Sequence, residues 1–158
     1  MSEYSACIEA PFGALGLLTR GEVLAGVDFL PASTPRIRAR EALAREATRQ
    51  LAAYFDDPRF RFDLPLDIVG THFQKRVWAL MCAIPAGAAR TYGEAARELH
   101  SAARAVGGAC GASPLAIVIP CHRIVGAQGL GGFMGRAADE TLTIKRWLLR
   151  HEAYPGVR

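Results

Sequence analysis

The feature that most constrains this chain is a short apolar run that ends at a cysteine. Residues 117–119 read Ile-Val-Ile, which favours a buried strand, and Pro120 cannot donate to a strand ladder. We therefore predict that a strand stops at Pro120 and that Cys121 lies at its end. A thiol there would be held rigidly at a pocket wall, where His122 and Arg123 supply positive charge that favours the nucleophilic thiolate. The alternative for Cys121 alone is a buried structural cysteine.

The composition is that of a globular protein with reduced thiols. The chain has 158 residues, 51% of them hydrophobic, which suffices for the core of one domain or two small ones. No apolar run approaches the roughly 18 residues that span a bilayer, and the start lacks the pattern of a signal peptide, so we expect a cytoplasmic protein. The cysteines show no CxxC spacing, which argues against a zinc site and a disulfide framework. They are Cys7, Cys82, Cys110 and Cys121.

Charge is divided unevenly along the chain. Residues 1–69 carry 8 basic and 10 acidic side chains, whereas residues 70–158 carry 11 basic and 5 acidic ones. The basic half fits a polyanion partner, although a solvated basic face would have the same composition.

The amino-terminal third predicts a small sheet followed by a helix. Three apolar runs separated by turn residues indicate antiparallel strands. From about Pro35, apolar residues recur every three to four positions, which predicts an amphipathic helix that ends near residues 56–58. This part contains no nucleophile or ligand cluster, so its expected role is support. The expected strands are residues 6–10, 13–18 and 23–30.

The rest of the chain predicts a helical domain. We place the boundary in the extended connector before Gly70, which gives a support domain of residues 1–69 and a second domain of residues 70–158. Thr71 fits the N-cap of a first helix, and a short break between the second and third helices suggests a helix-turn-helix unit. A glycine-rich hairpin or wing is expected over residues 123–133. The expected helices end near Met81, Leu99, Cys110 and His151.

The third of these helices has a nearly bare surface. It is built of small residues around one long basic side chain, Arg104. Two successive glycines, Gly107 and Gly108, would weaken a helix unless something approaches its backbone closely. Tight packing against a neighbouring helix is one explanation. The other is insertion into the DNA minor groove, where Arg104 would enter the base stack.

The segment around the cysteine resembles a known family. Residues 120–123, Pro-Cys-His-Arg, are similar to the active-site signature of the O6-alkylguanine-DNA alkyltransferases, also called methylated-DNA–protein-cysteine methyltransferases. The match is strong over residues 62–152 and weak in the amino-terminal third. Matching segments occur in family order at residues 70–74, 77–78, 84–87, 91–93, 103–107, 132–133 and 148–149, and at Lys145 and Glu152.

The resemblance implies a fold, a reaction and a set of site residues. The implied fold is α+β: a ribonuclease H-like three-stranded antiparallel sheet plus helix, then a winged helix-turn-helix-like helical domain that carries Cys121. The implied reaction moves an alkyl group from O6-alkylguanine in duplex DNA, with O4-alkylthymine as a candidate second substrate, irreversibly to Cys121. No cofactor, metal, membrane or obligate protein partner is implied, and we expect a monomer. The implied catalytic residues are Cys121 as acceptor, His122 as base through a bound water, Glu152 as orienting acid and Tyr92 as donor to the departing base. The implied substrate and DNA contacts are Arg104, Ala103, Ala105, Gly107, Arg123, Ser113, Phe133 and Met134.

Three departures from the family pattern affect the pocket. Ser113 stands where the family usually has Asn, and it replaces only part of the hydrogen bonding of an amide. Phe133 stands where Tyr is common, and residues 134–136 replace a smaller, glycine-rich sequence, with a few extra residues before Lys145. These changes bear on pocket size and rate rather than on the reaction.

Two other functions remain open at this point. The chain resembles the alkyltransferase-like damage sensors, which bind flipped alkylguanine without removing the alkyl group, but those lack the acceptor cysteine. A cysteine hydrolase is the second alternative, opposed by the absence of an obvious oxyanion motif.

Overall fold

The computed structural model of the chain describes residues 3–131 and 139–157. The chain divides into two units. Unit 1 comprises Met1–Val69 and Pro114–Val118, and unit 2 comprises Gly70–Ser113 and Ile119–Arg158. Residues 114–118 thus belong to unit 1, although the expected division was a single cut before Gly70.

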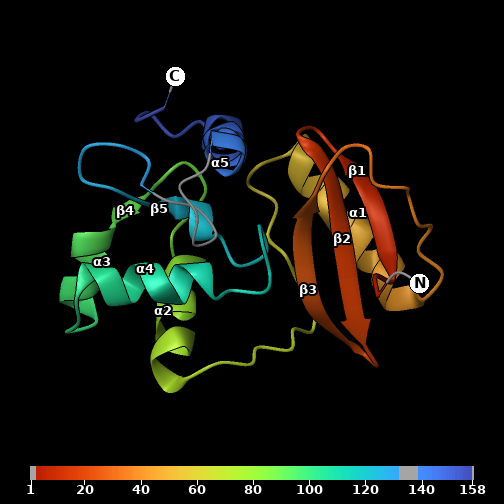
Figure 1. Cartoon of the computed structure of the whole chain (residues 1–158), viewed down its shortest axis with the longest axis horizontal. Coiled ribbons are helices and arrows are strands. Elements are labelled where there is room, and N and C mark those ends of the chain that lie inside the picture. The colour runs from red at the N-terminus through yellow and green to blue at the C-terminus, as the bar shows by residue number, and fades with distance from the viewer. Residues whose placement is uncertain (1–2, 132–138, 158) are drawn as a thin grey trace. The chain divides into compact units, whose positions relative to one another are not determined.

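Unit 1 is an antiparallel sheet with a helix on one face (Figure 1). Strands β1 (Ala6–Ala10), β2 (Gly13–Arg20) and β3 (Val23–Leu30) pair in sequence order, which confirms the three strands expected from the apolar runs. Helix α1 (Ala42–Asp56) packs against β2 and β3 and buries Leu51 and Tyr54.

The prediction that helical structure starts near Pro35 is wrong, because α1 begins only at Ala42. Ile37 instead pairs with Cys7 of β1: the Ile37 N–H donates to the Cys7 carbonyl at 3.1 Å, and the Cys7 N–H donates back at 3.0 Å. The residues before α1 therefore satisfy part of the outer edge of β1, which outweighs their helical periodicity.

Unit 2 contains four α-helices among its described residues, at the positions that the sequence predicted. They are α2 (His72–Cys82), α3 (Tyr92–Glu98), α4 (Ala103–Gly111) and α5 (Asp139–His151). Thr71 caps α2 in a capping box with Gln74, and Thr91 caps α3 in the same way with Glu94. These local signals explain why both helix starts were readable from the sequence.

Two further contacts hold unit 2 together. The indole Nε1–H of the buried Trp78 on α2 donates to the Ala109 carbonyl of α4 at 2.8 Å. The short strands β4 (Arg90–Thr91) and β5 (Ile124–Val125) pair in parallel. Together these contacts fix α4 and the residues after Cys121 within the unit.

The strand expected at residues 117–119 is not formed, although Ile117, Val118 and Ile119 are buried as predicted. Pairing with β3 is limited to a single bridge between Val27 and Leu115. Ile117 then has φ of +71°, and the Val118 N–H donates to the Ala116 carbonyl at 2.8 Å, which turns the chain tightly. A positive φ is strained for a β-branched residue, so the turn ends the pairing before Pro120 is reached.

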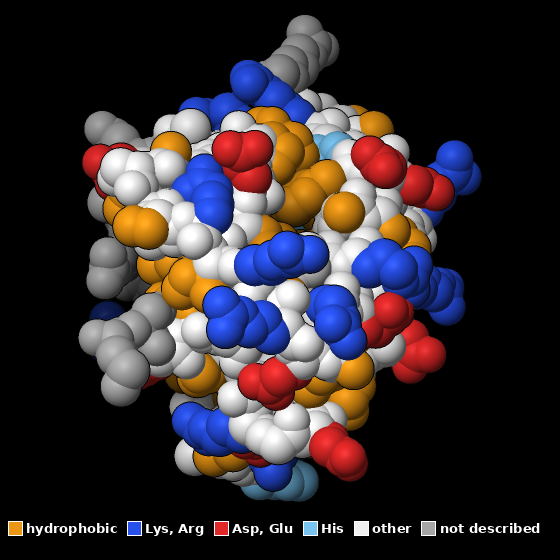
Figure 2. Space-filling model, turned by 90° about the vertical axis from the view of Figure 1, so that its right-hand side faces the viewer, with side chains coloured by type: hydrophobic (Ala, Val, Ile, Leu, Met, Phe, Trp, Pro, Cys, Tyr) orange, Lys and Arg blue, Asp and Glu red, His pale blue; other side chains and the backbone are white. Residues whose placement is uncertain are grey.

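On the face of the molecule shown in Figure 2, basic and acidic side chains are interspersed, so this face has no large patch of a single charge. Over residues 3–131 and 139–157, no helix has both the length and the apolar character needed to cross a membrane.

Candidate functional site

The structure brings together Cys121, His122 and Glu152 inside unit 2. A 3-10 turn, η1 (Cys121–Arg123), follows Pro120 and carries the first two, while Glu152 directly follows α5. His122 Nε2 lies 2.7 Å from Glu152 Oε2, and both side chains are fully buried. The other ring nitrogen, His122 Nδ1, is buried and has no hydrogen-bond partner among the described residues. A nucleophile, a base candidate and an orienting acid therefore share one site.

The inward face of α5 is not the one that carries its aromatic rings. Trp147 and His151 stack on each other at 4.8 Å and are only partly buried. The buried positions are Lys145, Leu148, Leu149 and Glu152, spaced by three or four residues. This face is what brings Glu152 to His122.

The charges of the pair follow from burial and from Arg123. Burial alone would raise the pKa of Glu152, but hydrogen bonds from His122 and Arg123 and the positive charge of Arg123 outweigh it and lower the pKa to about 2. Burial also lowers the pKa of His122 despite the opposing pull of Glu152. At neutral pH the pair therefore consists of a carboxylate and a neutral imidazole.

The acceptor thiol rests in its protonated form. Burial raises the pKa of Cys121 to about 11, with a partly opposing contribution from a hydrogen bond with the Ser113 side chain. Sγ of Cys121 also donates to the Cys110 carbonyl at 3.5 Å. Ser113 thus contacts the thiol, while Asn at that position would offer a longer amide. Because the resting thiol is protonated, the site needs a base during reaction.

Arg123 is held inside the protein, which differs from the expectation that it contacts DNA. Its Nε and Nη2 donate to the two carboxylate oxygens of Glu152 at 2.9 and 3.0 Å. Its Nη1 donates to the Ile84 carbonyl at 2.6 Å, and only 13% of the side chain is exposed. The guanidinium is therefore occupied by three contacts within unit 2.

Tyr92 lies at the start of α3 beside the loop that follows β5. A Cβ atom added at Gly131, where φ is +73°, would lie 2.7 Å from the Tyr92 ring, so glycine is required there. The Lys145 ammonium lies 5.8 Å from the centre of the same ring. The geometry thus places Tyr92, the glycine-rich loop and Lys145 against one another.

Lys145 was noted in the sequence only as a matching position. It is fully buried, and its Nζ donates to the carbonyls of Ile124 and Leu130 at 2.7 and 2.5 Å. Burial lowers its pKa to about 8, and it interacts electrostatically with Cys110 and Cys121. The signal that could have identified it is a lysine placed between apolar residues on the inward face of α5.

Helix α4 presents its small residues to solvent. Ala103, Arg104 and Ala105 are exposed, and Arg104 has no hydrogen bond or ion pair with the described residues. A Cβ atom added at Gly108 would meet nothing within 4 Å, and one at Gly107 would make only an ordinary 3.9 Å contact with Tyr92. Packing inside the protein therefore does not explain the two glycines.

Two of the expected site residues, Phe133 and Met134, lie outside the described residues.

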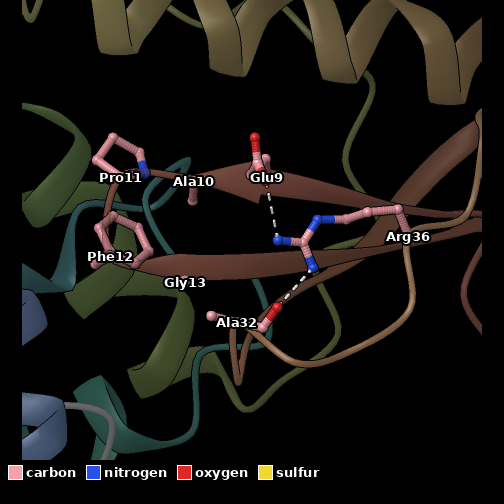
Figure 3. A pocket seen from close by; sticks show the side chains of 7 residues that line it. All are labelled: Glu9, Ala10, Pro11, Phe12, Gly13, Ala32 and Arg36. Atoms are coloured by element: carbon pink, nitrogen blue, oxygen red, sulfur yellow. Dashed lines mark hydrogen bonds and ion pairs between the residues drawn. The ribbon is translucent and has the colours of Figure 1, made fainter.

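An open pocket of about 630 Å3 lies in unit 1 around Phe12 (Figure 3). Its charged residues, Glu9 and Arg36, pair with each other at 3.4 Å, and its lining holds no nucleophile.

The buried carboxylate predicts acid sensitivity. The pKa of Glu152 is about 2 in the folded protein and 4.5 in the unfolded reference. The stability that its ionised carboxylate contributes is therefore complete above pH 4.5 and is lost as the pH falls through 2. We expect the free energy of unfolding to fall over this window, and Glu152→Gln to flatten the fall. Urea unfolding curves, monitored by tryptophan fluorescence at several pH values, measure this change in the free energy of unfolding.

Glu46→Gln is the matched control for this measurement. Its carboxylate also has a pKa lowered to about 2, but the side chain is 42% exposed and pairs with Arg49 on the surface, where solvent screens the interaction. We expect Glu46→Gln to leave the acid dependence nearly intact. An equal flattening by both variants would contradict the assignment to Glu152.

Comparison with known proteins places this geometry in context. Residues 72–154 match the family described as 6-O-methylguanine DNA methyltransferase, DNA binding domain. A protein of Mycolicibacterium paratuberculosis named methylated-DNA–protein-cysteine methyltransferase is 39% identical over 96% of this chain and 94% of its own. One of the same name from Methanosarcina acetivorans is 41% identical over 94% and 97%.

A solved structure shows the same fold. The crystal structure of Mycobacterium tuberculosis OGT in complex with DNA has a TM-score of 0.76 and 38% sequence identity, covering 92% of this chain and 90% of that one. An O6-methylguanine DNA methyltransferase from Methanococcus jannaschii has a TM-score of 0.62 at 25% identity. The α+β fold expected from the sequence is therefore confirmed.

Proposed function

The chain belongs to the 6-O-methylguanine DNA methyltransferase family, and from this premise we propose that it repairs alkylated DNA by direct reversal. In this reaction an alkyl group moves from O6 of guanine to Sγ of Cys121. One observation carries the proposal: the buried thiol of Cys121 lies next to a neutral His122. The ring of His122 is anchored through Nε2 by Glu152, and its Nδ1 has no partner among the described residues. Family members are named for the same transfer.

The proposed step conserves atoms and charge. The Cys121 sulfur forms a bond to the alkyl carbon while the bond from that carbon to guanine O6 breaks. The thiol proton passes through a bound water to His122 Nδ1, and Tyr92 donates a hydrogen bond to the departing base. The base leaves as a guanine anion and takes up one proton at N1 from solvent, while His122 returns its proton to solvent. The products are unmodified guanine and a thioether on Cys121. A thioether offers water no good leaving group, so each molecule reacts once.

The resting state explains why a base is needed. A buried thiol with a pKa of about 11 is almost wholly protonated at neutral pH, so little thiolate exists before substrate arrives. His122, kept neutral by burial, is able to accept that proton. Lys145, which interacts with the thiol, stabilises the negative charge as it develops.

Helix α4 is the proposed DNA-contacting element. Its exposed small residues allow the helix to lie in the minor groove, and Arg104 is free to fill the space left by a flipped nucleotide. The bare surface at Gly108 supports this, because no part of the described protein uses it. Ala103, Ala105 and Gly107 belong to the same proposed contact, with Phe133 and Met134 assigned to the pocket by resemblance alone.

Domain roles and location complete the proposal. We assign support to residues 1–69 and both DNA binding and alkyl acceptance to residues 70–158. A cytoplasmic location fits the chemistry, because the acceptor must stay reduced and all four cysteines are free thiols.

The test is the mass of the protein after exposure to an oligonucleotide duplex that contains O6-methylguanine. We expect a stoichiometric gain of about 14 Da, one methyl group, on the Cys121 peptide and on no other. Retained DNA binding with unchanged mass would overturn transfer and favour a damage sensor. Repeated turnover with release of the alkyl group would indicate a hydrolase.

A further inference from the structure

We propose that Arg123 determines which nitrogen of His122 carries the proton, and that it is thereby a positioning residue for alkyl transfer. The inference rests on the proposed function only in assigning His122 as the base. The placement of the proton is a property of the resting protein and can be measured without substrate.

The geometry gives Arg123 control of Glu152. Two of its nitrogens, Nε and Nη2, donate to the two carboxylate oxygens at 2.9 and 3.0 Å, a bidentate pair. The third contact, from Nη1 to the Ile84 carbonyl at 2.6 Å, anchors the guanidinium to the turn after α2. The clamp therefore joins three segments of unit 2: η1, the end of α5 and the turn at Ile84.

This clamp keeps the carboxylate charged. The Glu152 side chain has no exposed surface, and a carboxyl buried without a cation would become neutral. Arg123 is always protonated and supplies the compensating charge at hydrogen-bond distance. His122 cannot replace it, because burial favours the neutral imidazole.

A charged Glu152 fixes the tautomer of His122. A carboxylate only accepts hydrogen bonds, so the 2.7 Å contact with Nε2 requires the proton to be on Nε2. Nδ1 then keeps its lone pair, and this is the buried nitrogen that finds no partner within residues 3–131 and 139–157. The ring is thus set to receive a proton at Nδ1, which is what the proposed reaction demands.

Removing Arg123 reverses this order. A buried Glu152 without its clamp takes up a proton, and its O–H then donates a hydrogen bond to Nε2. The histidine proton therefore moves to Nδ1. A ring with Nδ1–H cannot accept the proton of Cys121. Besides Glu152 and Arg123, the other charged group that acts on His122 is Lys145, and it is unchanged in the variant.

The experiment combines nitrogen NMR with transfer kinetics. We would label histidine with 15N in the whole protein and in Arg123→Met and Arg123→Lys, and record two-bond 1H–15N correlations at neutral pH. Wild type should show His122 as the Nε2–H tautomer, and Arg123→Met should show Nδ1–H. The rate of benzyl transfer from free O6-benzylguanine should fall roughly 10²–10⁴-fold in Arg123→Met, the usual contribution of a general base. Arg123→Lys keeps the charge and should retain the wild-type tautomer and most of the rate.

Arg76→Met is the control, because Arg76 is an exposed arginine of α2 in the same unit that donates to a single carbonyl, that of Leu99. It should leave both readouts unchanged. An Nδ1–H tautomer in wild type, or an unchanged tautomer and rate in Arg123→Met, would overturn the proposal. If Arg123→Met fails to fold, the comparison of wild type with Arg123→Lys tests the proposal. Loss of the Nε2–H tautomer in Arg123→Lys would then contradict a role that depends on the charge of Arg123. A wild type with Nε2–H but no alkyl transfer would refute the proposed function alone.

Discussion

Cys121→Ala is expected to abolish alkyl transfer while leaving duplex binding unchanged. The alanine side chain has no nucleophile, and the loss of a buried thiol near Ser113 leaves only a small void. DNA binding is assigned to α4, and Cys121 is not a residue of that helix. Transfer is measured as the mass gain after incubation with O6-methylguanine duplex, and binding as the shift of a labelled duplex.

Cys110→Ala is the matched control for this variant. Cys110 is also a buried thiol in unit 2, and its pKa is raised by burial to about 12, so it should not compete as an acceptor. The Cys110 carbonyl that accepts from Cys121 belongs to the backbone and is kept in the variant. Full transfer in Cys110→Ala and none in Cys121→Ala is the expected pair of results. A methyl group appearing on Cys110 in the Cys121→Ala protein would contradict a unique acceptor.

Features encoded by neighbouring residues could be predicted from the sequence. Thr71 with Gln74 and Thr91 with Glu94 form capping boxes, which depend only on residues three positions apart. The strands of unit 1 likewise follow from apolar runs bounded by turn residues. In each case the deciding interactions are local, so no knowledge of the tertiary structure was needed.

Features set by tertiary contacts could not be predicted. Residues 117–119 have the composition of a strand, but only Leu115 finds a partner in β3, and the turn at Ile117 ends the pairing. Burial was predicted correctly because it depends on side-chain type, whereas strand formation depends on an available edge. Ile37 shows the reverse case, since its pairing with Cys7 replaces the expected helix.

The charged residues of the site show the same limit. Arg123 directly follows His122, and the family resemblance assigned it to DNA, yet its partners Ile84 and Glu152 are 39 and 29 positions away. Lys145 was noted only as a position that matches the family, and it is buried against the carbonyls of Ile124 and Leu130. Charge type is visible in a sequence, but the partner that uses the charge is not.

Arg104→Ala is expected to slow repair of O6-methylguanine in duplex DNA by roughly 100-fold, because unstacking a nucleotide costs a few kcal/mol and the proposed role of Arg104 is to offset that cost. Reaction with free O6-benzylguanine should be unchanged, since no duplex is opened. The side chain is exposed and has no partner among the described residues, so its loss should not affect folding. Single-turnover rates on the two substrates measure the ratio.

Arg146→Ala and Gly108→Gln separate this role from charge and shape. Arg146 is an exposed arginine of the same unit, so its removal makes the same change in net charge and should reduce the duplex rate only slightly. At Gly108 there is open space, and glutamine is a better helix former than glycine, so Gly108→Gln should fold at least as stably as wild type. Yet its side chain would stand on the surface assigned to the minor groove, so duplex repair should fall while reaction with the free base persists. Equal losses on duplex and free base in Arg104→Ala, or normal duplex repair in Gly108→Gln, would show that α4 does not lie in the groove.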